Sequence, residues 1–294
     1  MTPAVAGGSL LAVPNVSEGR DPEVIDAIGG AFVSGGALLL DVHADPDHHR
    51  SVYTLAGAPG QLAPALVAGA REAIARVDLT APRGSHPHVG ALAVAPLVHL
   101  DAPRRGAACA EALVAAHELG RLGLPVFLYG ALADGRTRAE LRRGGIERLA
   151  QRLDQGALRP DFGPSGPHPT AGVTLVAARP PLIAFNIELE PPATLAEATT
   201  IAADLREGGP HGLPGVRAIG LTLPARDDVA QVSCNVEDHE AVPLAALVAA
   251  VAARAPVAGC ELVGLAPRRA FAGFPDDVPV RNRRTVEDAV DLDS

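Results

Sequence analysis

The chain contains no lysine, because all 25 of its basic residues are arginine. This absence excludes mechanisms that need a lysine amine: Schiff-base chemistry, pyridoxal-phosphate anchoring, the P-loop of nucleotide-binding proteins and the ATP-binding lysine of kinases. Tryptophan is also absent, and aromatic residues make up only 3% of the 294 residues. Together with a formal net charge of −9, this composition argues against a nucleic-acid-binding protein.

Cysteine is scarce, and its three residues, Cys109, Cys234 and Cys260, form no CxxC pair. An odd number of widely spaced cysteines indicates neither a disulfide framework nor a structural zinc site. We expect all three to be core residues. No apolar run reaches the roughly 18–20 residues that a membrane span requires, and the first residues do not resemble a signal peptide. We therefore expect a cytoplasmic protein.

Hydrophobic residues make up 48% of the chain, and the length suits one large or two modest domains. Up to about residue 153, apolar strand-like runs alternate with helix-like segments, which indicates an α/β or α+β fold. The segment 155–172 is rich in proline and glycine, which is typical of a functional loop or a linker. We expect a domain boundary near residue 178, giving domains 1–178 and 179–294.

In the first domain, Asp21, Pro22 and Glu23 form a helix start, with an N-cap side chain, proline at the first helical position and an acid in the first turn. We expect polar loops at 43–49 and 83–90. The expected strands are 9–13, 37–41, 51–55 and 125–129, and 91–97 is a further apolar run. The expected helices are 22–34, 61–77, 106–122 and two short basic helices between 137 and 153.

The sequence pattern of the second domain predicts the element order β-α-β-β-α-β, which is the ferredoxin-like pattern. The expected elements are strand 182–189, helix 195–206, strands 216–223 and 229–236, helix 243–253 and strand 260–265. The charged tail after Gly273 is expected to be loosely held.

Two strands of this second domain show a regular alternation of side chains. One face carries apolar residues, and the other is expected to be an uncharged, hydrogen-bonding face with Asn186, Gln231, Ser233 and Asn235 on it, beside Glu188. Such a face is either an ordinary solvated side of an antiparallel sheet or a covered side that holds a polar ligand. Both interpretations remain open.

Histidines gather in the segments 41–50 and 83–90, in loops where a rigid scaffold commonly places catalytic groups. A histidine near its usual pKa can take a proton from an attacking amine and return it to a leaving nitrogen. A nitrogen/oxygen metal site built from His86 and His88 with Asp45, Asp47 or His48 is an alternative. A structural role for each histidine is another.

Eight blocks of the sequence resemble the glutamate formimidoyltransferase family and follow the family's order from about residue 11 to 267. They are 13–20 (VPNVSEGR), 45–54 (DPDHHRSVYT), 86–96 (HPHVGALAVAP), 126–130 (VFLYG), 159–165 (RPDFGPS), 182–189 (LIAFNIEL), 230–235 (AQVSCN) and 261–267 (ELVGLAP). The cyclodeaminase half to which animal members are fused has no counterpart here, so the chain resembles the stand-alone form.

The resemblance implies an α+β fold of two α/β sandwich subdomains with facing β-sheets, folate bound between them, and a homodimer. The implied reaction moves a formimidoyl group between N5 of tetrahydrofolate and the amine of L-glutamate, a step of histidine degradation. Tetrahydrofolate would be a co-substrate, and no metal is expected.

The resemblance also assigns roles to individual residues. His86, the histidine before proline, is implied as the general base and acid. A larger set is implied or expected to bind folate or substrate: Asp161, Phe162, Gly163, Pro164, Ser165, Asn186, Gln231, Ser233, Asn235, Arg50, Arg20, His43 and His88.

Three positions depart from the family pattern: His88 replaces an arginine, Ala93 an aspartate and His43 an acidic residue. Two other hypotheses therefore stand beside the transferase. One is a folate-binding homologue with altered or lost activity. The other is a metal-assisted hydrolase that uses the histidines of segments 43–49 and 86–88.

Overall fold

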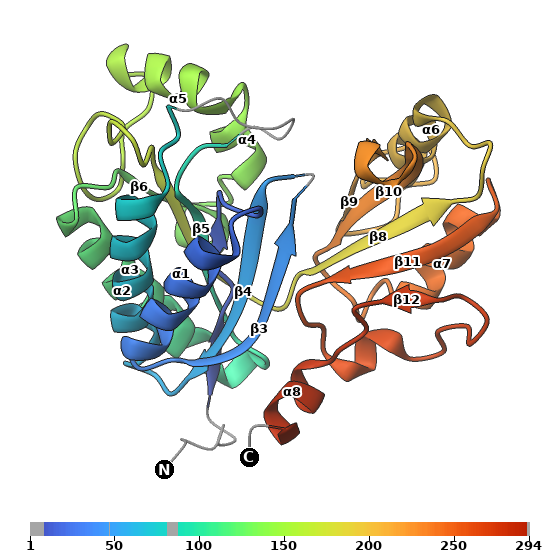
Figure 1. Cartoon of the computed structure of the whole chain (residues 1–294), viewed down its shortest axis with the longest axis horizontal. Helices are drawn as coiled ribbons and strands as arrows, with labels where there is room; N and C mark the ends of the chain where they lie inside the picture. The colour runs from blue at the N-terminus through green and yellow to red at the C-terminus, as the bar shows by residue number, and fades with distance from the viewer. Residues whose placement is uncertain (1–8, 47, 81–87, 293–294) are drawn as a thin grey trace. The chain divides into compact units, whose positions relative to one another are not determined.

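The computed structural model describes residues 9–46, 48–80 and 88–292, and the chain divides into two compact units between Arg179 and Pro180. Both units combine helices with a β-sheet, which confirms an α+β fold (Figure 1). None of the helices in the described ranges is long and apolar enough to cross a membrane.

The N-terminal unit is built on a mixed seven-stranded sheet. Its strands are β1 (Leu10–Ala12), β2 (Asn15–Val16), β3 (Leu38–Asp45), β4 (Arg50–Gly57), β5 (Leu92–Val98), β6 (Val126–Leu128) and β7 (Thr174–Arg179). The short strands β1 and β2 both lie between β4 and β5, and β3 flanks β4. Strands β5, β7 and β6 are parallel, with β7 in the middle.

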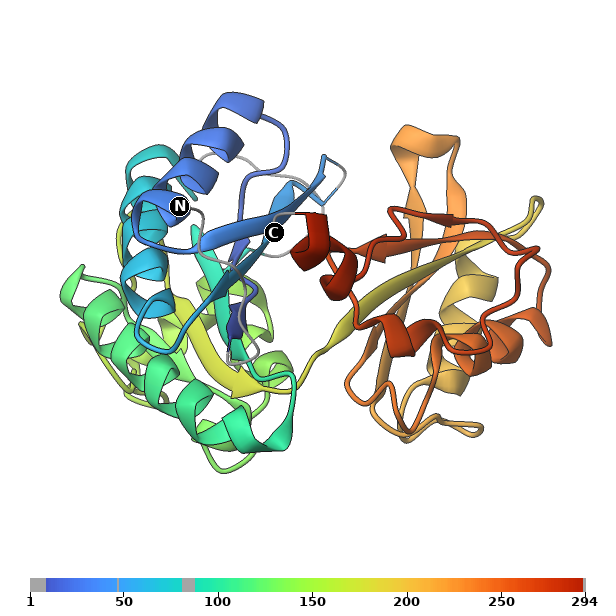
Figure 2. The same ribbon diagram turned by 90° about the horizontal axis from the view of Figure 1, so that it is seen from below.

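Helices cover both faces of this sheet. They are α1 (Pro22–Ser34), α2 (Leu62–Arg76), α3 (Arg105–Arg121), α4 (Arg138–Arg142) and α5 (Gly145–Asp154). Figure 2 shows α1, α2 and α3 in one layer, and their apolar side chains share a core with Val126 and Val176. The alternating residues Phe127 and Leu175 instead pack with Leu141 of α4. Because neighbouring strand residues point to opposite faces, α4 and α5 cover the second face.

Local signals set the helix boundaries. Asp21 accepts hydrogen bonds from the backbone N–H groups of Glu23 and Val24, so the predicted start of α1 is confirmed. Helix α2 has no capping side chain of its own. Its first turn is held by Glu111 of α3, whose carboxylate accepts from Gly60 N at 2.6 Å and Ala63 N at 2.7 Å.

Two expectations for this unit are wrong. The expected loop 43–49 is shorter, because β3 continues through His43 to Asp45 and pairs with β4 in a hairpin. Strand β7 was not expected. It is a parallel strand flanked on both sides and almost wholly buried, so it has no polar alternation to signal a strand.

The C-terminal unit confirms the predicted ferredoxin-like order. Its elements are β8 (Ile183–Leu189), α6 (Leu195–Leu205), β9 (Val216–Leu223), β10 (Val229–Val236), α7 (Leu244–Ala252), β11 (Val257–Val263), β12 (Val280–Arg281) and α8 (Val286–Leu292). The sheet order is β12-β11-β8-β10-β9, and its first four strands in sequence pair antiparallel. Cys234 and Cys260 lie in the core with α6 and α7.

The tail after Gly273 is more ordered than expected. Strand β12 pairs parallel with β11, Phe274 packs against Phe185 and Phe271, and Val286 is buried. The charge of this segment misled the prediction, because its few apolar side chains complete the core.

Candidate active site on the N-terminal unit

The implied catalytic residue, His86, lies outside the described residues, and its neighbour His88 ties the following chain to the sheet. The Nδ1 atom of His88 is 2.9 Å from Ser17 Oγ, and Ser17 Oγ donates to the carbonyl oxygen of Gly90 at 2.8 Å. A hydroxyl has one proton, so His88 Nδ1 is the donor to Ser17. The neutral His88 therefore carries its proton on Nδ1.

Glu18 organises the turn that follows β2. Its Oε1 accepts from the backbone N–H groups of Gly19, Arg20 and Asp21 at 2.9, 2.8 and 3.2 Å. Gly19 packs so closely against the β3–β4 hairpin that a Cβ atom would lie 2.4 Å from Arg50 N and 2.5 Å from Asp45 O. Only glycine fits this approach, so the turn and the hairpin are fixed against each other.

Two adjacent histidines of the hairpin face different carboxylates. His49 Nδ1 lies 3.2 Å from Glu18 Oε1 and accepts from Gly19 N at 3.2 Å. His48 Nδ1 lies 2.5 Å from Asp45 Oδ2. Burial alone would raise the pKa of Asp45, but hydrogen bonds from the side chain and backbone of His48 lower it to about 2. Asp45 is therefore a carboxylate at neutral pH.

These groups form one polar cluster, which we call the Ser17–His49–His88 cluster. The rings of His49 and His88 meet edge to face with their centroids 6.2 Å apart. His49, His48 and Ser17 are all buried. Imidazoles beside carboxylates are common in sites of general acid–base catalysis, and His88 of this cluster is two residues from His86 in the sequence.

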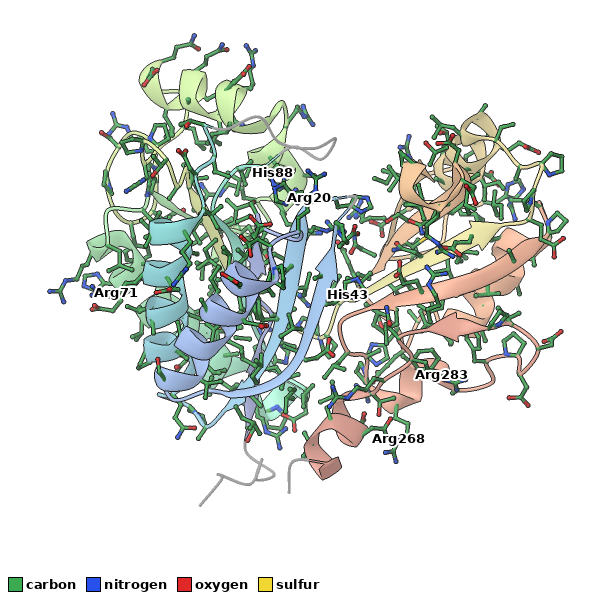
Figure 3. The ribbon with its side chains drawn as sticks, in the orientation of Figure 1. Arg20, His43, Arg71, His88, Arg268 and Arg283 are labelled. Atoms are coloured by element: carbon green, nitrogen blue, oxygen red, sulfur yellow. The ribbon has the colours of Figure 1, made fainter. Side chains whose placement is uncertain are left out.

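The other predicted residues of this unit occupy different places. Arg20 is exposed, and its Nε donates to Pro46 O at 2.9 Å. Arg50 begins β4 opposite Asp45, and the half-buried His43 lies two residues before Asp45 on β3, opposite Val52 (Figure 3). Their roles in substrate binding stay predictions.

The loop 161–165 is anchored to the N-terminal sheet. The Oδ2 atom of Asp161 accepts from Leu128 N at 2.7 Å and forms an ion pair with Arg136. Phe162 pairs with Val126 as an isolated β-bridge, and Gly163 has a φ of 82°, with Leu124 O where a Cβ would lie. These contacts hold the loop in place and leave Pro164 and Ser165 exposed. Folate binding by the five residues stays a prediction.

The polar face of the C-terminal sheet contains the predicted amides. Ser233 lies directly opposite Asn186, and Gln231 opposite Glu188. The side chain of Gln231 is buried, with an exposure of 1%, and neither its amide oxygen nor its amide nitrogen has a hydrogen-bond partner among the described residues. Unsatisfied buried amides are rare and costly, so this pair of atoms fits a bound polar ligand.

The expectation that this face is uncharged is wrong. Glu188 accepts two hydrogen bonds of 2.7 Å from Arg281 and also pairs with Arg226. Burial favours the neutral acid, yet the hydrogen bonds and charge of Arg281, with those of Arg226, lower the pKa of Glu188. Glu261 joins through Asn186 and Arg281. The error arose because Arg281 comes from β12, which was not expected.

No group of three or more His, Cys, Asp or Glu side chains is placed to hold a metal ion within residues 9–46, 48–80 and 88–292. A groove of about 1030 Å³ lies along α4 and α5, and charged side chains of both signs line it, among them Arg143, Glu147 and Arg148. None of the predicted site residues that the structure describes lines this groove.

Sequence reasoning named neither Ser17 nor Glu18 as a site residue, and it included His49 only among the histidines of the metal-assisted hydrolase hypothesis. Ser17 and Glu18 belong to the block VPNVSEGR, which carried part of the family resemblance. The sequence Glu18-Gly19 was the available signal, since a glycine beside a carboxylate indicates a tight, hydrogen-bonded turn.

Comparison with known proteins identifies the family. A family model described as "Formiminotransferase domain, N-terminal subdomain" matches residues 9–179, and one described as "Formiminotransferase domain" matches residues 184–276. The boundary between these two matched regions lies close to the boundary between the two compact units. The chain belongs to the formiminotransferase family.

The curated relatives are of two lengths. Formimidoyltransferase-cyclodeaminase of Sus scrofa is 40% identical over 278 residues, which cover 88% of this chain and 50% of that protein. Glutamate formimidoyltransferase of Streptococcus pyogenes serotype M1 is 35% identical, over 88% of this chain and 89% of that protein. That of Thermoplasma acidophilum is 33% identical, covering 88% of each. The chain thus spans about half the length of the cyclodeaminase-fused relatives.

Proposed function

We propose that this protein is a glutamate formimidoyltransferase that uses tetrahydrofolate as co-substrate. The observation that carries the proposal is the match to both subdomains of the family, together with 33–35% identity to two proteins of that name over 88–89% of their length. Histidine degradation, a cytoplasmic location and a homodimer belong to the same proposal.

The proposed chemistry is acyl-type transfer between two nitrogens. The amine of L-glutamate attacks the formimidoyl carbon of 5-formimidoyltetrahydrofolate and forms a new C–N bond. The bond from that carbon to N5 then breaks, giving N-formimidoyl-L-glutamate and tetrahydrofolate. His86 takes the proton that the attacking amine loses and returns it to N5, and the reverse reaction uses the same steps. General acid–base catalysis of this kind contributes roughly 10²–10⁴-fold.

The described residues support this role for the segment that carries His86. His88 and Gly90 are tied to Ser17, and the Glu18 turn is locked to the β3–β4 hairpin. Rigid support of this kind positions a catalytic group for proton transfer. Gln231 on the C-terminal unit, with both amide atoms unpartnered among the described residues, is proposed to bind folate with Asn186, Ser233 and Asn235.

The test supplies the purified chain with 5-formimidoyltetrahydrofolate and L-glutamate and follows formation of tetrahydrofolate and N-formimidoyl-L-glutamate. Steady turnover with L-glutamate, and little with L-alanine, is the expected result. Folate binding without turnover would contradict the proposal and favour a binding homologue. Turnover of an unrelated amide that a chelator abolishes would favour a metal-assisted hydrolase.

A further inference from the structure

Tyr129 presents a buried hydroxyl with no hydrogen-bond partner among the described residues. The residue directly follows β6, is 8% exposed, and packs in the apolar cluster that contains Leu141 of α4 and Leu175 of β7. Its hydroxyl oxygen is fully buried and makes no hydrogen bond to any residue that the structure describes. An unsatisfied buried hydroxyl costs about 1–3 kcal/mol, so such a group points to a ligand that supplies an acceptor.

A positively charged side chain, that of Arg142, lies near Tyr129. Arg142, which follows Leu141 on α4, is half-buried. Burial and the neighbouring positive charges of Arg138 and Arg50 lower the pKa of Arg142 to about 10, while Tyr129 acts in the opposite direction. Arg142 therefore lies within electrostatic reach of both Tyr129 and Arg50, although the three come from different elements.

Sheet geometry places these groups on one face. Along β4, Tyr53 and Leu55 pack with α1 and α2 in the helix-covered core, so the alternating position Arg50 belongs to the opposite face. Tyr129 and α4 lie on that same opposite face. Arg50 directly follows His49, whose ring contacts that of His88, so Arg50 adjoins the Ser17–His49–His88 cluster in sequence.

We infer that Arg142, Tyr129 and Arg50 form a binding site for a substrate carboxylate. Guanidinium groups pair with carboxylates in a fork geometry, and a phenol O–H donates to a carboxylate oxygen. An anion there would also reduce the repulsion between the two arginines. This inference rests on the proposed function, because both L-glutamate and the glutamate tail of folate carry carboxylates. It adds Arg142 and Tyr129 to the residues that sequence analysis assigned.

Tyr129 is itself a usable reporter of binding. The chain has no tryptophan and two tyrosines, and the hydroxyl of the other, Tyr53, is fully buried and donates to Ile25 O at 2.9 Å. We expect L-glutamate to change the tyrosine emission of the full chain in a saturable way. The change should disappear in Tyr129→Phe, and the Kd should rise at least about tenfold in Arg142→Gln. Arg143→Gln, an exposed neighbour, is the matched control and should bind normally.

Kinetics then separate the two sources of the carboxylate. If L-glutamate occupies the site, Arg142→Gln raises the KM for L-glutamate and leaves the KM for folate within about twofold. If the tail of folate occupies it, the KM for folate rises instead, and a tail-free tetrahydropterin is insensitive to the change. The inference would be overturned if the Arg142→Gln and Tyr129→Phe variants keep the circular dichroism of the wild type and also keep its KM values and its emission response to L-glutamate. If L-glutamate still changes the tyrosine emission but the chain shows no transferase turnover, the proposed function is contradicted and the carboxylate-binding site is still supported.

Discussion

The imidazole of His88 donates through Nδ1 to Ser17 Oγ across 2.9 Å, and the same hydroxyl donates to Gly90 O. Ser17 thus sets both the tautomer of His88 and the path of the chain that leaves the His86 segment. We expect Ser17→Ala to lower kcat about 3–10-fold, in line with the loss of one hydrogen bond of about 0.5–1.5 kcal/mol. Ser17→Thr keeps the hydroxyl and should retain most of the activity. Equal kcat values for the wild type and Ser17→Ala would show that this contact does not position the loop.

The Asp45–His48 pair makes the free energy of unfolding depend on pH in the acidic range. Because the folded pKa of Asp45 is about 2 against an ordinary 3.8, the charged carboxylate stabilises the fold above pH 4. This contribution is about 2 kcal/mol at neutral pH, falls to about half by pH 3 and is lost as the pH approaches 2. Asp45→Asn should therefore lower the free energy of unfolding by about 2 kcal/mol at pH 7 and by about half as much at pH 3.

Urea unfolding followed by tyrosine emission measures this effect in the N-terminal unit alone, since Tyr53 and Tyr129 both belong to it. Asp154→Asn, at an exposed position, is the control and should show no comparable pH dependence. A destabilisation by Asp45→Asn that is the same at pH 7 and pH 3 would argue against the pair.

Glu111 replaces the missing cap of α2. Its removal in Glu111→Ala leaves the N–H groups of Gly60 and Ala63 without their acceptor, and we expect a loss of about 3 kcal/mol in unfolding free energy. Glu118→Ala, on the same helix with a more exposed side chain, should change stability by less than about 0.5 kcal/mol. The same urea titration measures both variants. Equal stability of Glu111→Ala and Glu118→Ala would contradict this capping role.

Arg281 stabilises the C-terminal sheet through Glu188. In Arg281→Ala the buried carboxylate keeps Arg226 as its charged partner among the described residues, and we expect a loss of about 1–2 kcal/mol, reduced by the partial exposure of Arg281. Hydrogen exchange measured by mass spectrometry should then show faster exchange in β8 and β11. Unchanged protection in these strands would mean that the ion pair is only a surface contact.

Sequence patterns predicted most of the fold because local signals were strong. The side chains of Asp21 and Pro22 determine the start of α1, and alternation in β8 and β10 predicted which residues face α6 and α7. Strand β7 escaped prediction because it is buried on both faces. Strand β12 escaped because its pairing with β11 depends on tertiary contacts that a charged tail does not reveal.

The candidate site was predictable only in part. The histidine segments drew attention to the right hairpin, but the partners of His49 and His88 come from the Glu18 turn and from Ser17, more distant in sequence. Arg142 and Tyr129 carry no local motif that marks a ligand site. Their significance appears only when burial and neighbouring charge are known.

The most direct test of the account is the transferase turnover of His86→Ala in the 294-residue chain. If His86 shuttles the proton between the two nitrogens, kcat falls roughly 10²–10⁴-fold, the KM values stay within a few-fold of the wild type, and added imidazole restores part of the rate. Turnover equal to that of the wild type would contradict the account.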